Sequence, residues 1–177
     1  MPKMFLHAPQ GAFTAEARAR VAAELTELGM ACERLIDTPQ IRAGIWVYFV
    51  EHAPDTVFRA GRQAAGPIMS LKVYALKGGF NAETKTRMVT EATAILGKYS
   101  KTDGGQVPAY VGILEVPEEN WGMYGQQVHL AAMQIKTGSE PDHRAHAAGR
   151  LQETIGLKTV MVYAATPAVS SPDLAKM

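Results

Sequence analysis

The first two residues of the chain, Met1 and Pro2, could present a reactive group. A small second residue commonly permits removal of Met1, and Pro2 would then carry a free secondary amine. An α-amino group titrates near ~7.7 to 8, and burial or a nearby cation lowers its pKa further. Such an amine can be neutral at pH 7 and act as a general base. The rigid ring would hold the nitrogen in place without a flexible side chain.

Two other residues with reactive side chains have simpler interpretations. Cys32 is the single cysteine, so it cannot form an intramolecular disulfide. It lies in a stretch with helical character, which favours a small buried side chain over a nucleophile. His7 follows Pro2 by five residues in a predicted strand. Because side chains alternate along a strand, His7 should point to the opposite face and play a structural role.

We expect no metal and no cofactor. His143 and His146 have an i, i+3 spacing that could share a metal ion, but the sequence shows no third ligand beside them. Gly78 and Gly79 form a predicted turn without the surrounding pattern of a phosphate-binding loop. Nucleotide binding is therefore not supported.

The composition is that of a folded domain and excludes several classes of partner. The chain has 177 residues, of which 47% are hydrophobic and 20% charged, and its net charge is +1. A nearly neutral chain lacks a broad basic surface for nucleic acid or anionic membranes. No apolar run approaches the ~18 residues of a membrane span. We therefore expect a cytoplasmic protein that binds a small molecule, neither nucleic acid nor membrane.

An internal repeat determines the predicted fold. The segment from Phe13 to Arg20 recurs from Phe80 to Arg87, with identical or similar residues at six of the eight positions. The second residue of each copy, Thr14 or Asn81, is a typical helix N-cap residue, which predicts two helices. Apolar residues at helical spacing give each helix one stripe to bury. These stripes comprise Val21, Leu25 and Leu28 in the first helix and Met88, Ala92 and Ile95 in the second.

Each predicted helix lies between two predicted strands, so that each copy reads as a β-α-β unit. The strands cover 3–8, 45–50, 71–77 and 109–115. The run Ile45 to Val50 (IWVYFV) is continuously apolar, which favours a strand buried on both faces. After each second strand, a similar short segment recurs at 57–61 and 121–125.

The predicted fold class is α+β. The two units, about 2–66 and 67–130, should pair into one four-stranded sheet with two helices on one face, forming a domain over 1–136. Residues 137–177 should form a C-terminal helix-strand extension that packs on this core or on a neighbouring subunit. An alternative arrangement of two β-α-β units is the ferredoxin-like sandwich, in which the strands of one unit are separated by a strand of the other.

The duplicated unit, the Met1-Pro2 start and the pattern Glu115-x-Pro117-x-x-x-Trp121-Gly122 together resemble the tautomerase superfamily. The resemblance covers residues 2 to about 130. It is to the 4-oxalocrotonate tautomerase-like, fused double-unit type, which is similar to cis-3-chloroacrylic acid dehalogenase and malonate semialdehyde decarboxylase. It implies a homotrimer and an N-terminal proline as catalytic base or acid.

The sequence departs from the pattern of the carboxylate-binding members. Only Lys77 matches a cation of the dehalogenase type, whereas Phe80 stands in place of its second arginine. The helical histidine of that type falls at about Gly29, and its water-activating tyrosine and glutamate fall at about Gly112 and Met123. Hydrolytic dehalogenation is therefore unsupported.

These departures predict a pocket with few charges and more aromatic surface. The strand arginine of simple tautomerases falls at Trp46 or Tyr110, and Trp121 aligns with an aromatic residue that lines their pocket. Lys77 could equally be a solvated strand end, and Trp121 could instead be a core or trimer-contact residue. The residues expected to bind substrate are Lys77, Gly78, Gly79, Tyr110 and Trp121.

The resulting hypothesis is a tautomerase-like enzyme. Pro2 would transfer a proton in the keto-enol conversion of a small 2-oxo or enol acid, and Lys77 with nearby backbone amides would stabilise the oxyanion. One alternative is a proline-dependent decarboxylase or hydratase of a small oxo or unsaturated acid. Another is a non-catalytic trimeric scaffold or ligand-binding protein of the same fold.

Overall fold

The two repeats of the sequence form two β-α-β units that share one sheet. The computed structural model describes residues 1–64, 68–101, 107 and 109–135. Strand β1 (Lys3–Pro9), helix α1 (Ala15–Cys32) and strand β2 (Trp46–His52) form the first unit. Strand β5 (Met69–Leu76), helix α3 (Ala82–Tyr99) and strand β6 (Ala109–Val116) form the second. The predicted fold class is confirmed for these units.

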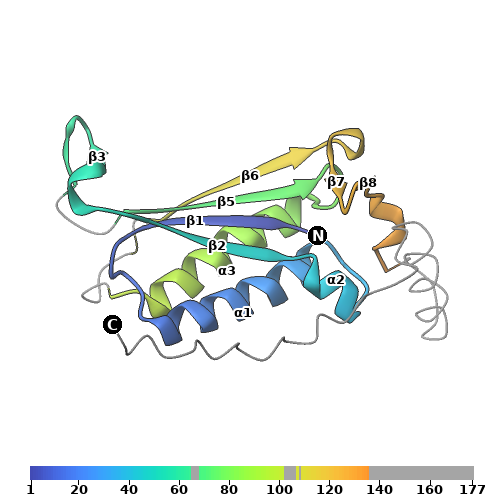
Figure 1. Cartoon of the computed structure of the whole chain (residues 1–177), viewed down its shortest axis with the longest axis horizontal. Coiled ribbons are helices and arrows are strands. Elements are labelled where there is room, and N and C mark those ends of the chain that lie inside the picture. Colours follow the sequence, from blue (N-terminus) through green and yellow to red (C-terminus); the bar gives the residue numbers. More distant parts are fainter. Residues whose placement is uncertain (65–67, 102–106, 108, 136–177) are drawn as a thin grey trace, which may run out of the picture.

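The four strands lie in the order β2-β1-β5-β6 (Figure 1). Strands of one unit are parallel, and β1 and β5 join the units in antiparallel pairing, with Lys3 opposite Tyr74 and His7 opposite Ser70. The strands of each unit are therefore direct neighbours. This order is incompatible with the ferredoxin-like alternative, in which a strand of the other unit would separate them.

Both helices cover the same face of the sheet (Figure 1). Thr14 accepts a hydrogen bond from the Ala17 amide, and Asn81 accepts one from the Thr84 amide, so both predicted N-caps are confirmed. The apolar stripes of the two helices are buried against the strands, as their spacing predicted. The buried stripe residues are Val21, Leu25, Leu28, Met88, Ala92 and Ile95.

The opposite face of the sheet has no cover within the described residues. Trp46 and Tyr48 of β2 are 42% and 41% exposed, and Phe5 of β1 stacks on Tyr48 with ring centroids 4.7 Å apart. The expectation that the segment Ile45 to Val50 is buried on both faces is therefore wrong for this chain. The reason is that β2 is an edge strand and that both helices lie on the other face of the sheet.

The segments that recur after β2 and β6 are short hairpins. β3 (Phe58–Arg59) pairs with β4 (Arg62–Gln63), and β7 (Gly122–Met123) pairs with β8 (Gln126–Gln127). In both turns a residue with φ of 52° precedes a glycine, Gly61 or Gly125, whose φ of 74° or 78° lies in the left-handed region. Two consecutive positive φ values are typical of the tight turns that join twisted strands.

The two hairpins have different surroundings. The first projects beyond one end of the sheet, whereas the second lies at the opposite end, close to the N-terminus (Figure 1). The predicted extension of residues 137–177, with its helix and strand, lies outside the described residues. Within the described part of the chain, no helix combines the length and the apolarity that crossing a membrane requires.

Candidate functional site

Pro2 lies at the start of β1, on the face of the strand that contacts α1. Met4, Leu6 and Ala8 of β1 are buried on the same face. The Pro2 ring packs so closely against Gly29 of α1 that a Cβ at this glycine would lie 2.8 Å from Pro2 Cγ. Pro2 is itself buried. The proline is therefore fixed between the sheet and the helix.

Met1 is buried in front of Pro2. It is only 1% exposed, and its thioether packs against Gly44, which follows the short helix α2 (Pro39–Ala43). Its amine donates a hydrogen bond of 2.6 Å to Oε2 of Glu33, and the two groups form a buried ion pair. The N-terminal amine thus has a single anionic partner among the described contacts.

The end of α1 positions Glu33. The helix ends in a Schellman motif, because the Arg34 amide bonds to Ala31 O and the Leu35 amide bonds to Met30 O. Arg34 adopts a left-handed conformation with φ of 53°, which reverses the chain. Glu33 is the C-cap residue of the helix. The turn leaves its carboxylate at the N-terminus of β1, where it contacts the Met1 amine.

Glu33 is 0% exposed and is the only charged residue in the buried set of the described chain. Its Oε2 binds the terminal amine, but its Oε1 has no hydrogen-bond partner there. A Cβ at Gly79, in the turn after β5, would lie 3.1 Å from this Oε1. Gly79 is therefore adjacent to Glu33, and the N-terminus, the end of α1 and the turn after β5 meet at one point.

The groups at this point have opposing effects on the pKa of the Met1 amine. Burial lowers the pKa of the Met1 amine below its ordinary value of 8.0, and Lys3 also lowers it, whereas Glu33 opposes the shift. Burial likewise lowers the pKa of Lys3 to about 8. The Lys3 ammonium donates to Gly44 O at 2.5 Å and lies 3.7 Å from the centroid of the Trp46 ring.

The predicted substrate-binding turn lies beside the N-terminus, but its amides are already bonded. The Gly78 amide donates to a Glu115 carboxylate oxygen at 3.4 Å, and the Gly79 amide donates to Leu76 O at 2.9 Å. Lys77 and Gly78 are exposed, whereas Gly79 is buried. In this arrangement Gly79 supplies space for Glu33, and the expected pair of free oxyanion donors is not present.

Trp121 and Tyr110 lie in different surroundings. Trp121 is 8% exposed and belongs to the buried cluster with Met123 and Val128. Tyr110 is 72% exposed. It lies opposite Ser70 of β5, and Ser70 lies opposite His7 of β1. That row of residues lies five positions along the strand from Pro2, about 17 Å at the usual rise. Within one chain, Tyr110 is therefore at the other end of the sheet from the proline.

The remaining reactive residues have structural surroundings. Cys32 is fully buried, and burial raises its thiol pKa to about 11, as expected of a structural cysteine. His7 lies on the uncovered face of the sheet, where its Nδ1 is 2.9 Å from His52 Nε2. The predicted pair His143 and His146 lies outside the described residues. Elsewhere in the described chain, no cluster of three or more metal-binding side chains occurs.

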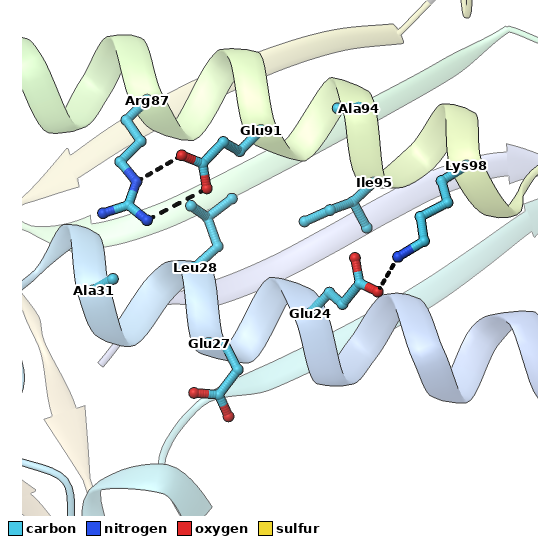
Figure 2. Close-up of a pocket in the computed structure, with 9 residues that line it drawn as sticks. All are labelled: Glu24, Glu27, Leu28, Ala31, Arg87, Glu91, Ala94, Ile95 and Lys98. Carbon is cyan, nitrogen blue, oxygen red and sulfur yellow. Dashed lines mark hydrogen bonds and ion pairs between the residues drawn. The ribbon is translucent and has the colours of Figure 1, made fainter.

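A groove runs between α1 and α3 on the side away from the sheet, and Figure 2 shows its lining. Its charged groups all form ion pairs, and Glu27 does so with Arg42, which lies outside the lining. Arg87 pairs with Glu91 and Lys98 pairs with Glu24, each at 2.7 Å. The groove contains no residue of the N-terminal site, and its ion pairs are those of an exposed helical surface.

Glu33 and Lys3 are the site residues that the sequence analysis did not single out. Lys3 directly follows Pro2, so its position alone could have suggested it. Glu33 interrupts the apolar stretch at the end of α1, and a charge in such a stretch signals a buried partner. What the sequence could not show is that the partner is the N-terminal amine, 32 residues away.

Comparisons with known proteins show the fold. No protein-family model and no curated protein sequence matches the chain. Fused 4-OT has a TM-score of 0.58 and 19% identity, over 71% of this chain and 94% of that one. RhCC from Rhodococcus jostii RHA1 has a TM-score of 0.60 and 17% identity, over 82% and 96%. N1, a member of the cis-3-chloroacrylic acid dehalogenase family, has a TM-score of 0.55 and 22% identity, over 87% and 98%.

The chain therefore has the fold of the tautomerase superfamily. This agrees with the resemblance deduced from the repeat, the Met1-Pro2 start and the segment around Trp121. At 17% to 22% identity the likeness establishes the architecture. The chemistry of this protein depends on the groups at its N-terminal site.

Proposed function

We propose that this protein is a tautomerase-type enzyme in which Pro2, after removal of Met1, is the general base for keto-enol proton transfer on a small 2-oxo or enol acid. The observation that carries the proposal is the buried N-terminus. The Met1 amine is buried beside Glu33 at the junction of β1, α1 and the turn after β5, and this burial lowers its pKa. A neutral amine held there can accept a proton.

Removal of Met1 would create the substrate space. Met1 is fully buried between Glu33 and Gly44, so its loss leaves a cavity in front of the proline nitrogen. Lys3 and Lys77 are the cations that we propose to attract the acid group of the substrate.

We also propose that the enzyme is a homotrimer assembled through the uncovered face of the sheet. That face exposes the large apolar side chains of Trp46, Tyr48, Tyr110 and Leu114, and contiguous apolar surface of this kind is typical of protein–protein contacts. Fused 4-OT has been described as symmetric and as asymmetric trimers. In such an assembly, Tyr110 could reach the site of a neighbouring subunit, although it lies far from Pro2 of its own chain.

Kinetics of two matched variants test the proposal. Pro2→Ala loses the ring that fixes the nitrogen, and we expect the rate of phenylpyruvate or 2-hydroxymuconate ketonisation to fall by ~10²- to 10⁴-fold. Insertion of one alanine between Met1 and Pro2 leaves the ring but converts its nitrogen to an amide, so activity should vanish. Ketonisation that is unchanged in both variants would reject the proline mechanism.

A covalent probe provides a second test. Pt0534, a solved structure with a TM-score of 0.57 and 19% identity, was inactivated by 2-oxo-3-pentynoate. We expect this compound to modify the nitrogen of Pro2 in our protein, which mass spectrometry of the N-terminal peptide would show. A peptide that still begins with Met1 and carries no adduct would contradict the proposal.

Acid catalysis is the second candidate, and Glu33 is the observation that favours it. Its carboxylate stabilises a charged amine, and a protonated Pro2 could act as the acid in a decarboxylation or hydration. The pH profile distinguishes the two roles. A base loses activity below the amine pKa, whereas an acid loses activity above it. If neither activity occurs, a ligand-binding scaffold of the same fold accounts for the chain.

A further inference from the structure

Glu33 has features that its role at the end of a helix does not explain. Its carboxylate is fully buried, one oxygen binds the terminal amine, and the other has no partner within the described structure. A buried polar atom without a hydrogen bond costs about 1–3 kcal/mol. An apolar residue at this C-cap would avoid that cost. Unsatisfied groups of this kind therefore point to a functional role.

The position of Glu33 relative to Pro2 follows from the backbone. The Met1 nitrogen lies 2.6 Å from Glu33 Oε2, and standard bond lengths separate it from the Pro2 nitrogen by at most ~3.6 Å. The Pro2 nitrogen is thus within about 6 Å of the carboxylate before Met1 is removed. Glu33 is therefore a buried anion close to the nitrogen that becomes the terminal amine once Met1 is removed.

We propose that Glu33 is a positioning residue for Pro2, which accepts the N–H of the neutral proline and so directs its lone pair toward the space that Met1 leaves. This inference rests on the proposed function. A neutral secondary amine has one N–H and one lone pair. If the N–H is donated to Glu33, the lone pair must point away from the carboxylate, into the substrate space.

The proton balance requires no change at Glu33. When the C–H bond of the substrate breaks, its electron pair stays on the substrate as an enolate, and the proton becomes the second N–H of Pro2. Return of that proton to another atom of the substrate regenerates the neutral amine. Glu33 holds the first N–H throughout and stabilises the ammonium between the two transfers.

The other charges around the amine are few. Lys3 comes from β1, and Lys77 is exposed in the turn after β5. Arg42 of α2 is paired with Asp37 at 2.6 Å and with Glu27 at 2.5 Å. The carboxylate of Glu33 is therefore the negative charge that can raise the proton affinity of Pro2, and Lys3 opposes it.

The test is a pH titration of the Pro2 nitrogen by nitrogen-15 NMR in the Met1-free protein, its Glu33→Gln variant and a control. Glutamine retains an acceptor oxygen and nearly the same shape but has no charge. We expect Glu33→Gln to reduce the proton affinity of Pro2 at least tenfold. Glu16→Gln removes the same charge from the exposed first turn of α1, where Glu16 pairs with Arg20, and should leave the titration unchanged.

The outcomes separate this inference from the proposed function. If Pro2 titrates identically in Glu33→Gln and in the unsubstituted protein, the role of Glu33 is overturned, even if Pro2→Ala shows that the proline is catalytic. If the titration shifts but no ketonisation is found, Glu33 controls the amine and the proposed reaction is wrong. If both hold, the acid limb of the kcat profile should move to lower pH in Glu33→Gln.

A measurement on the unsubstituted protein removes the dependence on variant folding. Because the proposal places the Glu33 carboxylate against the Pro2 amine, the side-chain carbon-13 shift of Glu33 should change at the pH at which Pro2 titrates. A shift of Glu33 that ignores the titration of Pro2 would show that the two groups do not interact, and would overturn the inference.

Discussion

Gly29→Ala should displace the Pro2 ring, and so reduce activity, at only a small cost in the stability of the fold. A Cβ at residue 29 would lie 2.8 Å from Pro2 Cγ and 2.9 Å from the terminal methyl of Met4. The Met4 methyl can rotate away, but the proline ring cannot move without moving the start of β1. Carbon atoms in contact are about 3.5–4.0 Å apart, so the ring must shift by about 0.7–1.2 Å.

The effect on stability is a balance of two contributions. Alanine in a helix interior is favoured over glycine by ~1 kcal/mol, whereas overpacking costs about 1–3 kcal/mol. The free energy of unfolding should therefore fall by only about 0–2 kcal/mol. A displacement of about 1 Å at a catalytic group can reduce the rate ~100-fold. We expect kcat/KM for ketonisation to fall by about that factor.

The second repeat provides a matched control. Gly97 lies in α3, and a Cβ there would approach Val107 Cγ2 to the same 2.8 Å, away from the N-terminus. Gly97→Ala should lose a similar amount of stability in urea denaturation and keep its kcat/KM. If the two variants lose activity equally, or if Gly29→Ala remains fully active while carrying the same packing defect, the reasoning about Pro2 is refuted.

Two further predictions concern stability. Burial, His52 and Lys72 lower the pKa of His7 in the folded protein, so protonation of His7 favours the unfolded chain. The stability that neutral His7 contributes above its ordinary pKa of 6.5 should therefore be lost as the pH falls toward the lowered value of the folded protein. His7→Asn should therefore lose less Tm than the unsubstituted protein between about pH 7.5 and pH 5.5, and an equal loss would contradict this. Arg34→Gly relieves a left-handed conformation at the C′ position of α1 and should raise the free energy of unfolding by about 0.5–1 kcal/mol, measured by urea denaturation; a decrease would show that the strain is absent.

Local sequence patterns predicted where the two helices start and which of their faces are buried. The N-cap residues Thr14 and Asn81 mark both starts, because capping depends on residues within one turn. The periodicity of the apolar residues predicted which helix faces are buried. The same reasoning failed at Trp46 and Tyr48, because sequence alone does not reveal that β2 is an edge strand with one uncovered face.

The site was predictable only in part. The start of the chain and the repeat pointed to Pro2. The predicted turn at Gly79 is adjacent to Glu33, which binds the terminal amine next to Pro2. Glu33 itself was missed, since its importance depends on a contact between residues distant in sequence. The prediction that the Gly78 amide binds substrate likewise overlooked a distant residue, because Glu115 of the neighbouring strand β6 accepts its hydrogen bond.

The central claim is that Pro2 carries a free amine that is neutral near pH 7. The nitrogen-15 titration of Pro2 in protein purified without an added N-terminal tag tests it most directly. We predict a nitrogen that titrates with a pKa below the ordinary α-amino value of ~8, because at the Met1 amine, one residue away, burial outweighs the charge of Glu33. A nitrogen that does not titrate, as in an amide that retains Met1, or one that titrates above that value, would contradict the account.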